Sequence, residues 1–323
     1  MTLQLSKDWI WDFWFDRDGN DYHIFYLKAP RQLEDAELRH WHVSIGHAVS
    51  QDLIDWSVLP DALRPSPSPA WDDCATWTGS VLHHKDMWYL FYTGVRCAED
   101  KLIQRIGLAT SPDLIHWKKY ADNPIIEADP RWYELLDLQL WHDQAWRDPW
   151  VFQHPETGDF HALITGRVNY GAADQRGVIA HARSTDLIHW DVLPPITEPG
   201  EFGQMEVPQL VAMRDGYYLI FSCGAKYHAA QRQASLGMIT GSYYLYAESP
   251  LGPFQHLSDV PLLGDKAGTF YSSKLIQGPD DKWYIMAFKN VDESGSFIGE
   301  ITDPMPVQIA EDGRLSVEPT GEI

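Results

Sequence analysis

Three acidic residues of this chain lie in surroundings that make a carboxylate chemically active. Asp12 lies within Trp9–Phe15, where aromatic residues surround it, so burying its carboxylate costs desolvation energy unless hydrogen bonds compensate. Asp148 directly follows Arg147, and neighbouring residues of a regular strand point to opposite faces, so a bulge is needed to bring both inward. Glu206 has apolar neighbours, which favour the protonated carboxyl that general acid catalysis requires.

The three acidic residues also share a position relative to the segments that follow them. Asp12, Asp148 and Glu206 precede aromatic segments that begin at Tyr22, Phe160 and Tyr217, respectively. Taken alone, each has a structural alternative: a strand-end Asp, an ion pair with Arg147, or a surface Glu at a turn. Equivalent positions of repeated units would bring the three together. Glycosyl transfer uses such a set, because one carboxyl protonates the leaving oxygen while another attacks the anomeric carbon or activates water.

Repeated segments along the whole chain indicate which elements hold these residues. The turn pattern Ser-x-Asp-Leu-Ile-x-Trp begins at Ser50, Ser111 and Ser184, and a degenerate copy runs from Ser249 to Phe254. Five short aromatic or apolar segments alternate with these turns and are predicted to be strands. They are Tyr22–Tyr26, Trp88–Tyr92, Phe160–Ile164, Tyr217–Phe221 and Trp283–Ala287. We therefore predict an all-β fold: one five-bladed β-propeller over residues 1–323, with four-stranded antiparallel blades around a central funnel.

The composition narrows the class of partner. The chain has 323 residues, of which 44% are hydrophobic and 13% aromatic, so it has ample material for a folded core. Its formal net charge of −21 disfavours nucleic acid and anionic membranes as partners. The N-terminal segment lacks the order of a signal peptide, so a cytoplasmic location is expected. Neither the three Cys nor the histidines have the spacing of a zinc site, so we predict no metal and no cofactor.

The acidic segments resemble the signatures of glycoside hydrolase families 32 and 68, and family 32 most closely. The family signatures Trp-Met-Asn-Asp-Pro-Asn-Gly, Arg-Asp-Pro and Glu-Cys-Pro correspond here to Trp9–Phe15, Arg147–Pro149 and Glu206–Pro208. Trp77–Ser80 and Thr269–Ser272 are similar to two further segments of the family. The first signature has lost its Pro-Asn-Gly. Members of these families are five-bladed propellers, so the resemblance implies the same fold as the repeats do.

The resemblance also implies a role for each carboxylate. Asp12 would be the nucleophile, Asp148 the stabiliser of the transition state, and Glu206 the general acid and base. A nucleophile must be ionised, so Asp12 would need hydrogen bonds or the nearby charge of Arg147. The chain ends where the C-terminal β-sandwich of the family would begin, so we expect a propeller without that domain. Residues expected to contact the substrate are Trp11, Trp77, Ser80, Arg147 and Tyr271.

Three functions remain open on the sequence alone. The favoured one is a retaining glycosidase that acts on furanosides, above all fructose-containing oligosaccharides, and that is able to transfer the sugar to another alcohol. The second is an inverting glycosidase similar to arabinanases and xylosidases, in which Asp12 would activate water. The third is a sugar-binding propeller without catalysis. All three take a small carbohydrate as partner, and the sequence carries no signal for an oligomeric state.

Overall fold

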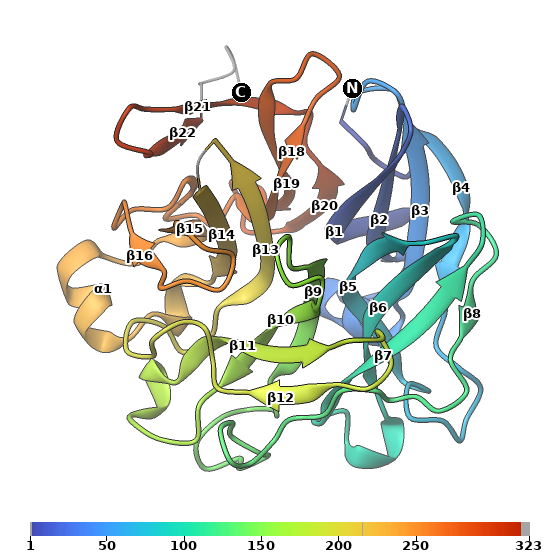
Figure 1. The fold of residues 1–323 in the computed structure, drawn as a ribbon, viewed down its shortest axis with the longest axis horizontal. Coiled ribbons are helices and arrows are strands. Elements are labelled where there is room, and N and C mark those ends of the chain that lie inside the picture. The colour runs from blue at the N-terminus through green and yellow to red at the C-terminus, as the bar shows by residue number, and fades with distance from the viewer. Residues whose placement is uncertain (1, 215, 318–323) are drawn as a thin grey trace.

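Five antiparallel sheets surround a central axis and form a five-bladed β-propeller (Figure 1). The structure is a computed structural model that describes residues 2–214 and 216–317, so residues 1, 215 and 318–323 of the predicted domain lie outside the described residues. The predicted all-β fold and the number of blades are confirmed. Helices are few: the α-helix α1 (Ala230–Leu236) has seven residues. Within the described part of the chain, no helix has the length and apolar character needed to cross a membrane.

Each blade is built from strands that follow one another in the chain, and the first strand of each lies closest to the axis. Blades one to three have four strands each, as predicted. Blade one has β1 (Asp8–Asp18), β2 (Asp21–Pro30), β3 (Ser44–Ser50) and β4 (Ser57–Leu63). Blade two has β5 (Ala75–His84), β6 (Met87–Val95), β7 (Gln104–Ser111) and β8 (Lys118–Lys119). Blade three has β9 (Trp146–Gln153), β10 (Phe160–Arg167), β11 (Gly177–Ser184) and β12 (Asp191–Leu193).

Blades four and five each have a fifth strand, which differs from the prediction of four. Both extra strands pair with a strand that already has its two neighbours, because that strand is long enough to hold two short partners in succession along one edge. Blade four has β13 (Glu206–Met213), β14 (Gly216–Cys223), β15 (Thr240–Ala247), β16 (Gln255–His256) and β17 (Leu263–Asp265). Blade five has β18 (Phe270–Gln277), β19 (Trp283–Val291), β20 (Phe297–Ile301), β21 (Met305–Ile309) and β22 (Leu315–Val317).

The repeated Ser-x-Asp-Leu turn joins the third strand of a blade to its fourth. In blade three, Ser184 Oγ donates to Asp186 Oδ1 at 3.1 Å. The same Asp186 oxygen accepts the backbone N–H groups of Ile188 and His189. Leu187 takes a positive φ of 69°, and the indole N–H of Trp190 closes the turn on its carbonyl at 3.2 Å. The copies at Ser50 and Ser111 form the same bonds. These turns are structural.

The innermost strand of every blade carries a β-bulge at the same level. The strand register shifts once in each of β1, β5, β9, β13 and β18, where extra residues are left without a partner. A bulge turns side chains that would otherwise alternate, so it aims them into the funnel. We call the residues left unpaired there the bulge ring. They are Asp12, Thr78, Asp148–Pro149, Val207–Pro208 and Ser272–Ser273.

The propeller closes between blade five and blade one. Leu3 forms a bridge with Ile301, which connects the start of the chain to the last blade. The guanidinium of Arg31 donates to the carbonyls of Ile298 and Gly299 in blade five, both at 3.1 Å, and to that of Asp8 in blade one at 3.0 Å. No strand is shared between the two blades among the described residues, so these bonds form the seam of the ring.

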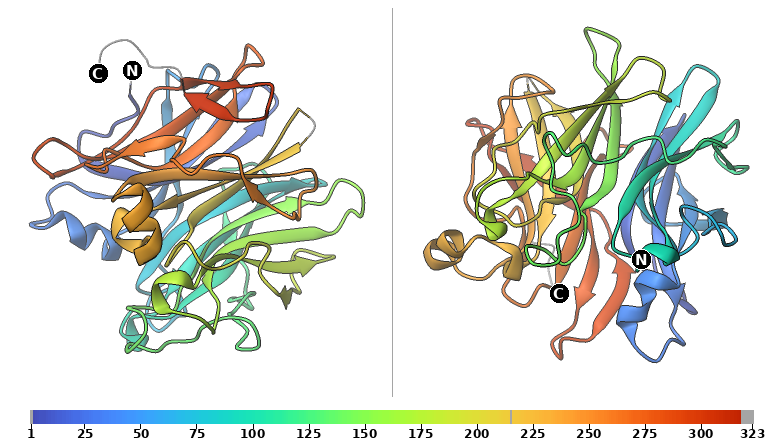
Figure 2. Two further views of the ribbon diagram at one scale, coloured as in Figure 1. Left: turned by 90° about the vertical axis from the view of Figure 1, so that its left-hand side faces the viewer. Right: turned by 90° about the horizontal axis from the view of Figure 1, so that it is seen from below.

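Short helices mark one face of the propeller. The 3-10 helices η1 (Ala36–Trp41), η2 (Cys97–Glu99), η3 (Ala173–Gln175) and η4 (Ala225–Tyr227) each follow the second strand of a blade, and α1 comes directly after η4. Figure 2 shows α1 and η1 on the same face. The connections that carry η1, η2 and η4 supply residues to the mouth of the cavity described next.

Candidate active site

A cavity of about 770 Å³ opens on this face, and residues of all five blades line it. It contains Asp12, Asp148 and Glu206, so the structure brings the three acidic residues together. Trp11, Trp77, Arg147 and Tyr271 line the same cavity. Ser80 does not: it is 1% exposed, and its hydroxyl accepts the backbone N–H of Val151 at 3.0 Å, which joins blades two and three.

Asp148 is held by the blades on either side of its own. Its backbone N–H, freed by the bulge, donates to Thr93 Oγ1 of blade two at 2.9 Å. Its Oδ2 atom accepts Thr165 Oγ1 at 2.9 Å and the backbone N–H of Val207 in blade four at 3.1 Å. Burial raises the pKa of Asp148, against the lowering effects of Arg147 and of these hydrogen bonds. The side chain is therefore fixed in one orientation at the floor of the cavity.

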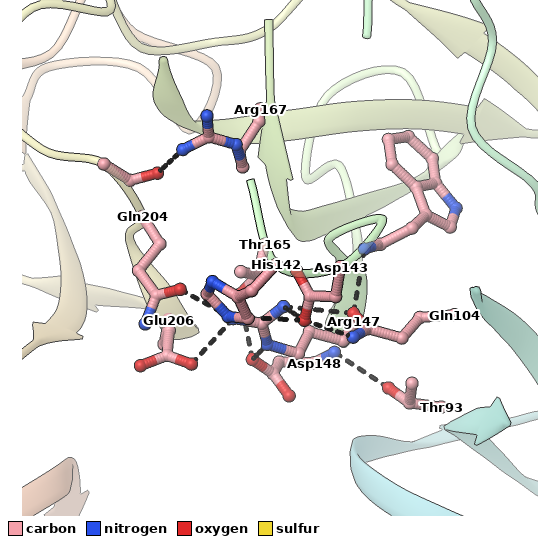
Figure 3. A network of polar contacts seen from close by, with 12 residues as sticks. Thr93, Gln104, His142, Asp143, Arg147, Asp148, Thr165, Arg167, Gln204 and Glu206 are labelled. Atoms are coloured by element: carbon pink, nitrogen blue, oxygen red, sulfur yellow. Dashed lines mark hydrogen bonds and ion pairs between the residues drawn. The ribbon is translucent and has the colours of Figure 1, made fainter. Parts of the chain in front are cut away.

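Arg147 connects the acidic residues to the amides of the cavity wall (Figure 3). Its Nη2 atom donates to Glu206 Oε1 at 2.8 Å and to Gln204 Oε1 at 3.1 Å. Its Nη1 atom donates to Gln104 Oε1 at 3.0 Å and lies 3.5 Å from Asp143 Oδ2. The bulge of β9 thus turns Arg147 and the next residue to the same side, as the sequence argument required. A planar guanidinium with acceptors on both edges has little freedom to turn.

Glu206 is held through both of its carboxyl oxygens. Arg147 binds Oε1, and the hydroxyl of Tyr271 donates to Oε2 at 2.5 Å. Burial, and then the charge of Glu206, raise the pKa of Tyr271 well above its ordinary value, so the phenol keeps its proton and remains a donor. The side chain of Glu206 is still 20% exposed. A carboxyl that is fixed on two sides and open to the cavity suits proton transfer to a bound molecule.

Asp12 is the unpaired residue of the first bulge. Thr78 Oγ1 donates to its Oδ2 atom at 3.4 Å, and the side chain of Ser272 acts to lower its pKa. Burial, followed by the charges of Asp148 and Glu206, raises the pKa of Asp12 to about 7. Of the two kinds of support expected for Asp12, hydrogen bonds or the charge of Arg147, the structure has a hydrogen bond from Thr78, and the cation that lowers this pKa is Lys274.

Aromatic residues form one wall of the cavity. Trp11 is 1% exposed and meets the ring of His40 edge-on, with the centroids 5.9 Å apart. The indole N–H of Trp77 donates to the carbonyl of His40 at 2.9 Å, and its ring lies 5.4 Å from that of Trp41. Flat apolar surfaces of this kind suit the apolar faces of a sugar ring. Burial lowers the pKa of His40 to about 4, so this wall carries no charge from it at neutral pH.

Several cavity residues were not found from the sequence. Thr78 and Ser272 had a signal, because they precede the aromatic segments at Trp88 and Trp283 by nearly the interval that separates Asp12 from Tyr22. A search for acidic residues at this interval passes over hydroxyl side chains. Gln104, Asp143 and Gln204 belong to no repeat or motif, so only the fold reveals their place in the wall.

Comparison with known proteins identifies the family to which the chain belongs. A sequence model described as the N-terminal domain of family 32 glycosyl hydrolases matches residues 14–301, which is most of the chain. The chain belongs to glycoside hydrolase family 32. The match begins two residues after Asp12, so Asp12 itself lies just outside it while the last two residues of the first signature, Trp14 and Phe15, lie inside.

The relatives of this family 32 chain include enzymes whose names refer to sucrose or raffinose. It is 27% identical over 294 residues to sucrose-6-phosphate hydrolase of Escherichia coli, which covers 87% of this chain and 54% of the relative. It is 25% identical over 319 residues to raffinose invertase of the same species, with 94% and 60% covered. The chain thus spans little more than half of these relatives. The inulosucrase of Halalkalicoccus jeotgali bound to kestose has the same fold, with a TM-score of 0.79, 22% identity, and 97% and 87% of the two chains covered.

Proposed function

We propose that this family 32 chain cleaves β-fructofuranosides with retention of configuration. The observation that carries the proposal is the convergence of Asp12, Asp148 and Glu206, from three different blades, on one cavity with an aromatic wall. The names of the relatives point to small fructosides such as sucrose and raffinose as substrates. The amide and acidic side chains around Arg147 would bind the sugar hydroxyls.

In the first step, an ionised oxygen of Asp12 attacks the anomeric carbon of the fructosyl unit. The bond from that carbon to the leaving oxygen breaks, and Glu206 gives its proton to the leaving oxygen. This forms an ester between the fructosyl unit and Asp12. Asp148 holds hydroxyls of the sugar while positive charge develops on the ring, since its own carboxylate is fixed by Thr165 and Val207.

In the second step, water gives a proton to Glu206 and attacks the same carbon from the side that the leaving group vacated. The ester bond breaks, Asp12 becomes a carboxylate again, and fructose leaves with its original configuration. A sugar hydroxyl in place of water would give transfer instead of hydrolysis. Arg147 and Tyr271 hold the Glu206 carboxyl in one place for both proton transfers.

The two alternatives from the sequence lose ground. An inverting mechanism would place water between Asp12 and the sugar, and the family match favours fructoside chemistry over arabinanase-like chemistry. A propeller that only binds sugar would have no need for a Glu held between a cation and a phenol.

The proposal is tested by hydrolysis of a substrate panel: sucrose, sucrose 6-phosphate, raffinose, inulin, levan, arabinan and xylan. We expect fructose release from at least one of the fructosides, and proton NMR of the first product should show the retained anomer. Glu206→Gln should lower kcat by about 10²–10⁴-fold, because the amide cannot donate the proton. Glu248→Gln, an exposed residue of the same blade, is the matched control and should leave the rate unchanged. Inverted product, release from arabinan or xylan alone, or full activity of Glu206→Gln would overturn the proposal.

A further inference from the structure

Lys274 is a buried cation that the proposed mechanism does not use. It lies on β18 and is 2% exposed. Its ammonium donates to the backbone carbonyl of Val207 at 2.5 Å. Burying a charged group without compensation is costly, so a lysine in this place calls for a physical reason.

The bulge of β18 explains why the side chain points inward. Tyr271 pairs with Phe288, and Lys274 pairs with Met286, so two steps along β19 correspond to three along β18. In a regular strand, residues three apart point to opposite faces, whereas here both lie opposite residues of one face. The bulge therefore turns Lys274 to the same side as Tyr271, which lines the cavity.

One peptide unit joins Lys274 to the floor of the cavity. The carbonyl of Val207 accepts the ammonium of Lys274, while its N–H donates to Asp148 Oδ2 at 3.1 Å. Ser272, two residues before Lys274, acts to lower the pKa of Asp12 through its side chain. Burial lowers the pKa of Lys274 to about 8, although Asp148 and Asp12 act to raise it, so the ammonium is charged at neutral pH.

The positive charge of Arg147 is directed at Glu206 and its neighbours more than at Asp12. Arg147 faces Glu206, Asp143 and Asp148, and the ion pair at 2.8 Å joins it to Glu206. Asp12 faces the negative charges of Asp148 on β9 and Glu206 on β13, and the neutral phenol of Tyr271 on β18. Lys274 is the cation that opposes the two negative charges at Asp12.

We propose that Lys274 is the counter-cation of Asp12 and Asp148, a positioning residue that holds Asp12 ionised for attack. The inference rests on the proposed function, because it names the residue that keeps the proposed nucleophile, Asp12, ionised. Lys274 touches no substrate atom in this role and acts only through the two carboxylates. Without it, Asp12 would face two negative charges and no cation, and its carboxyl would keep a proton to higher pH.

The test compares three substitutions that separate charge from packing. Lys274→Met removes the charge and the donor, Lys274→Gln keeps a donor for Val207 without the charge, and Lys274→Arg keeps the charge. Lys289→Met is the matched control, since Lys289 belongs to the same blade and pairs with Glu300 away from the cavity. The readout is kcat/KM against pH on the best fructoside of the panel.

We expect the acid limb of the profile to move up by about one pH unit in Lys274→Met and Lys274→Gln, because an opposite charge nearby lowers a carboxyl pKa by about 1–3 units. The limb should stay near the wild-type position in Lys274→Arg and in Lys289→Met. A purely structural role would lower the rate evenly at every pH and leave the limb in place, which would overturn the proposal.

A second measurement does not depend on activity. Carbon-13 NMR of the labelled Asp carboxyl groups gives the titration of Asp12, whose signal is assigned by its loss in Asp12→Asn. Its midpoint should rise by about one pH unit in Lys274→Gln. An unmoved midpoint would refute the inference even in an active protein. If the wild type cleaves no fructoside, the proposed function fails, while this titration still decides the role of Lys274. If Lys274→Met does not fold, the Gln variant decides the case.

Discussion

At the scale of single residues, the bulge ring shows how the chain holds a carboxylate that must stay reactive. Asp12 has Thr78 on one side and Ser272 on the other, from the neighbouring blades two and five. Hydroxyl groups at these positions favour the anion, whereas acidic residues there would repel it. The two carboxylates that face Asp12 belong to other blades: Asp148 lies in the bulge of blade three, and Glu206 comes directly before the bulge of blade four. This arrangement limits the repulsion at the proposed nucleophile without removing it.

The role of Asp12 predicts the outcome of two substitutions. Asp12→Asn should lower turnover more than about a thousandfold and leave sugar binding nearly intact, because the amide keeps the shape but cannot attack. Asp12→Gly should regain activity in the presence of azide, which fits into the space of the missing carboxylate. The product should be a fructosyl azide of inverted configuration, identified by NMR. Full activity of Asp12→Asn would remove Asp12 from the mechanism.

Tyr271 predicts a smaller and more specific loss. Tyr271→Phe removes the hydrogen bond to Glu206 Oε2 and leaves the carboxyl with Arg147 alone. A hydrogen bond to a charged group contributes about 1.5–3 kcal/mol, so kcat should fall about 10–100-fold. Tyr284→Phe is the control, because that hydroxyl binds Asp280 at the surface of the same blade. Equal rates for the two variants would show that Tyr271 does not position the acid.

The sequence predicted Asp12, Asp148 and Glu206, and also Arg147 and Tyr271, but not Lys274. Asp12, Asp148 and Glu206 could be found because acidic residues recur at a similar interval before the aromatic segments of three blades. Lys274 could not, because the alternation of a regular strand places it on the other face from Tyr271, and a two-residue bulge reverses that. Local register shifts of this kind depend on the neighbouring blades, so a linear pattern does not contain them.

At the scale of elements, two blades contain the same buried pair of histidines. His23 on β2 lies 2.9 Å from His47 on β3, between ring nitrogens, and His161 on β10 lies 2.8 Å from His181 on β11 in the same way. Each pair needs one ring nitrogen as donor and one as acceptor, so at least the accepting imidazole of each pair must be neutral. Burial lowers the pKa of His47 and of His181 to about 3.

These pairs predict a loss of stability in mild acid. The unfolded chain takes up protons on these histidines near their ordinary pKa of 6.5, whereas folded His47 and His181 do so near 3. Between those values the unfolded state binds more protons, so the free energy of unfolding falls as the pH falls. The loss is about 2 kcal/mol per buried His between pH 6.5 and pH 5.

Urea unfolding at about pH 7.5 and about pH 5 tests this prediction. His181→Gln keeps an acceptor for His161 but does not titrate, so its stability should change less between the two conditions. His116→Gln, on an exposed turn of blade two, is the control and should follow the wild type. A His181→Gln protein that loses as much stability in acid as the wild type would contradict the account.

Element prediction succeeded where a repeat was present and failed where it was absent. The Ser-x-Asp-Leu turns and the aromatic segments located the second and third strands of the blades, because buried strands and tight turns leave strong local patterns. The helix α1 and the extra strands β17 and β20 have no repeated counterpart and are short, so tertiary contacts rather than local sequence decide them.

At the scale of the whole molecule, the seam between blades five and one is where the ring should open first. Arg31→Met removes the bonds to Asp8, Ile298 and Gly299 and leaves these carbonyls without that donor. The free energy of unfolding should fall by about 2–4 kcal/mol. Hydrogen exchange should rise first in β1 and β20, which face each other across the seam.

A matched substitution separates the seam from the general loss of a charge. Arg17 is an exposed arginine whose guanidinium donates a hydrogen bond to the carbonyl of Gly19, two residues away. Arg17→Met should therefore change the free energy of unfolding by less than about 0.5 kcal/mol. If Arg31→Met were as stable as Arg17→Met, the ring would be closed by packing alone.

The bulge ring has a consequence for how such a protein changes over evolutionary time. Five corresponding backbone irregularities surround the site, and each belongs to a separate copy of the same structural unit. A mutation at one of these positions alters the chemistry without touching the turns or the strand pairings that fold the blade. Duplicated units of this design are free to diverge in the residue they present, so new specificities are reachable by single codon changes on an unchanged scaffold.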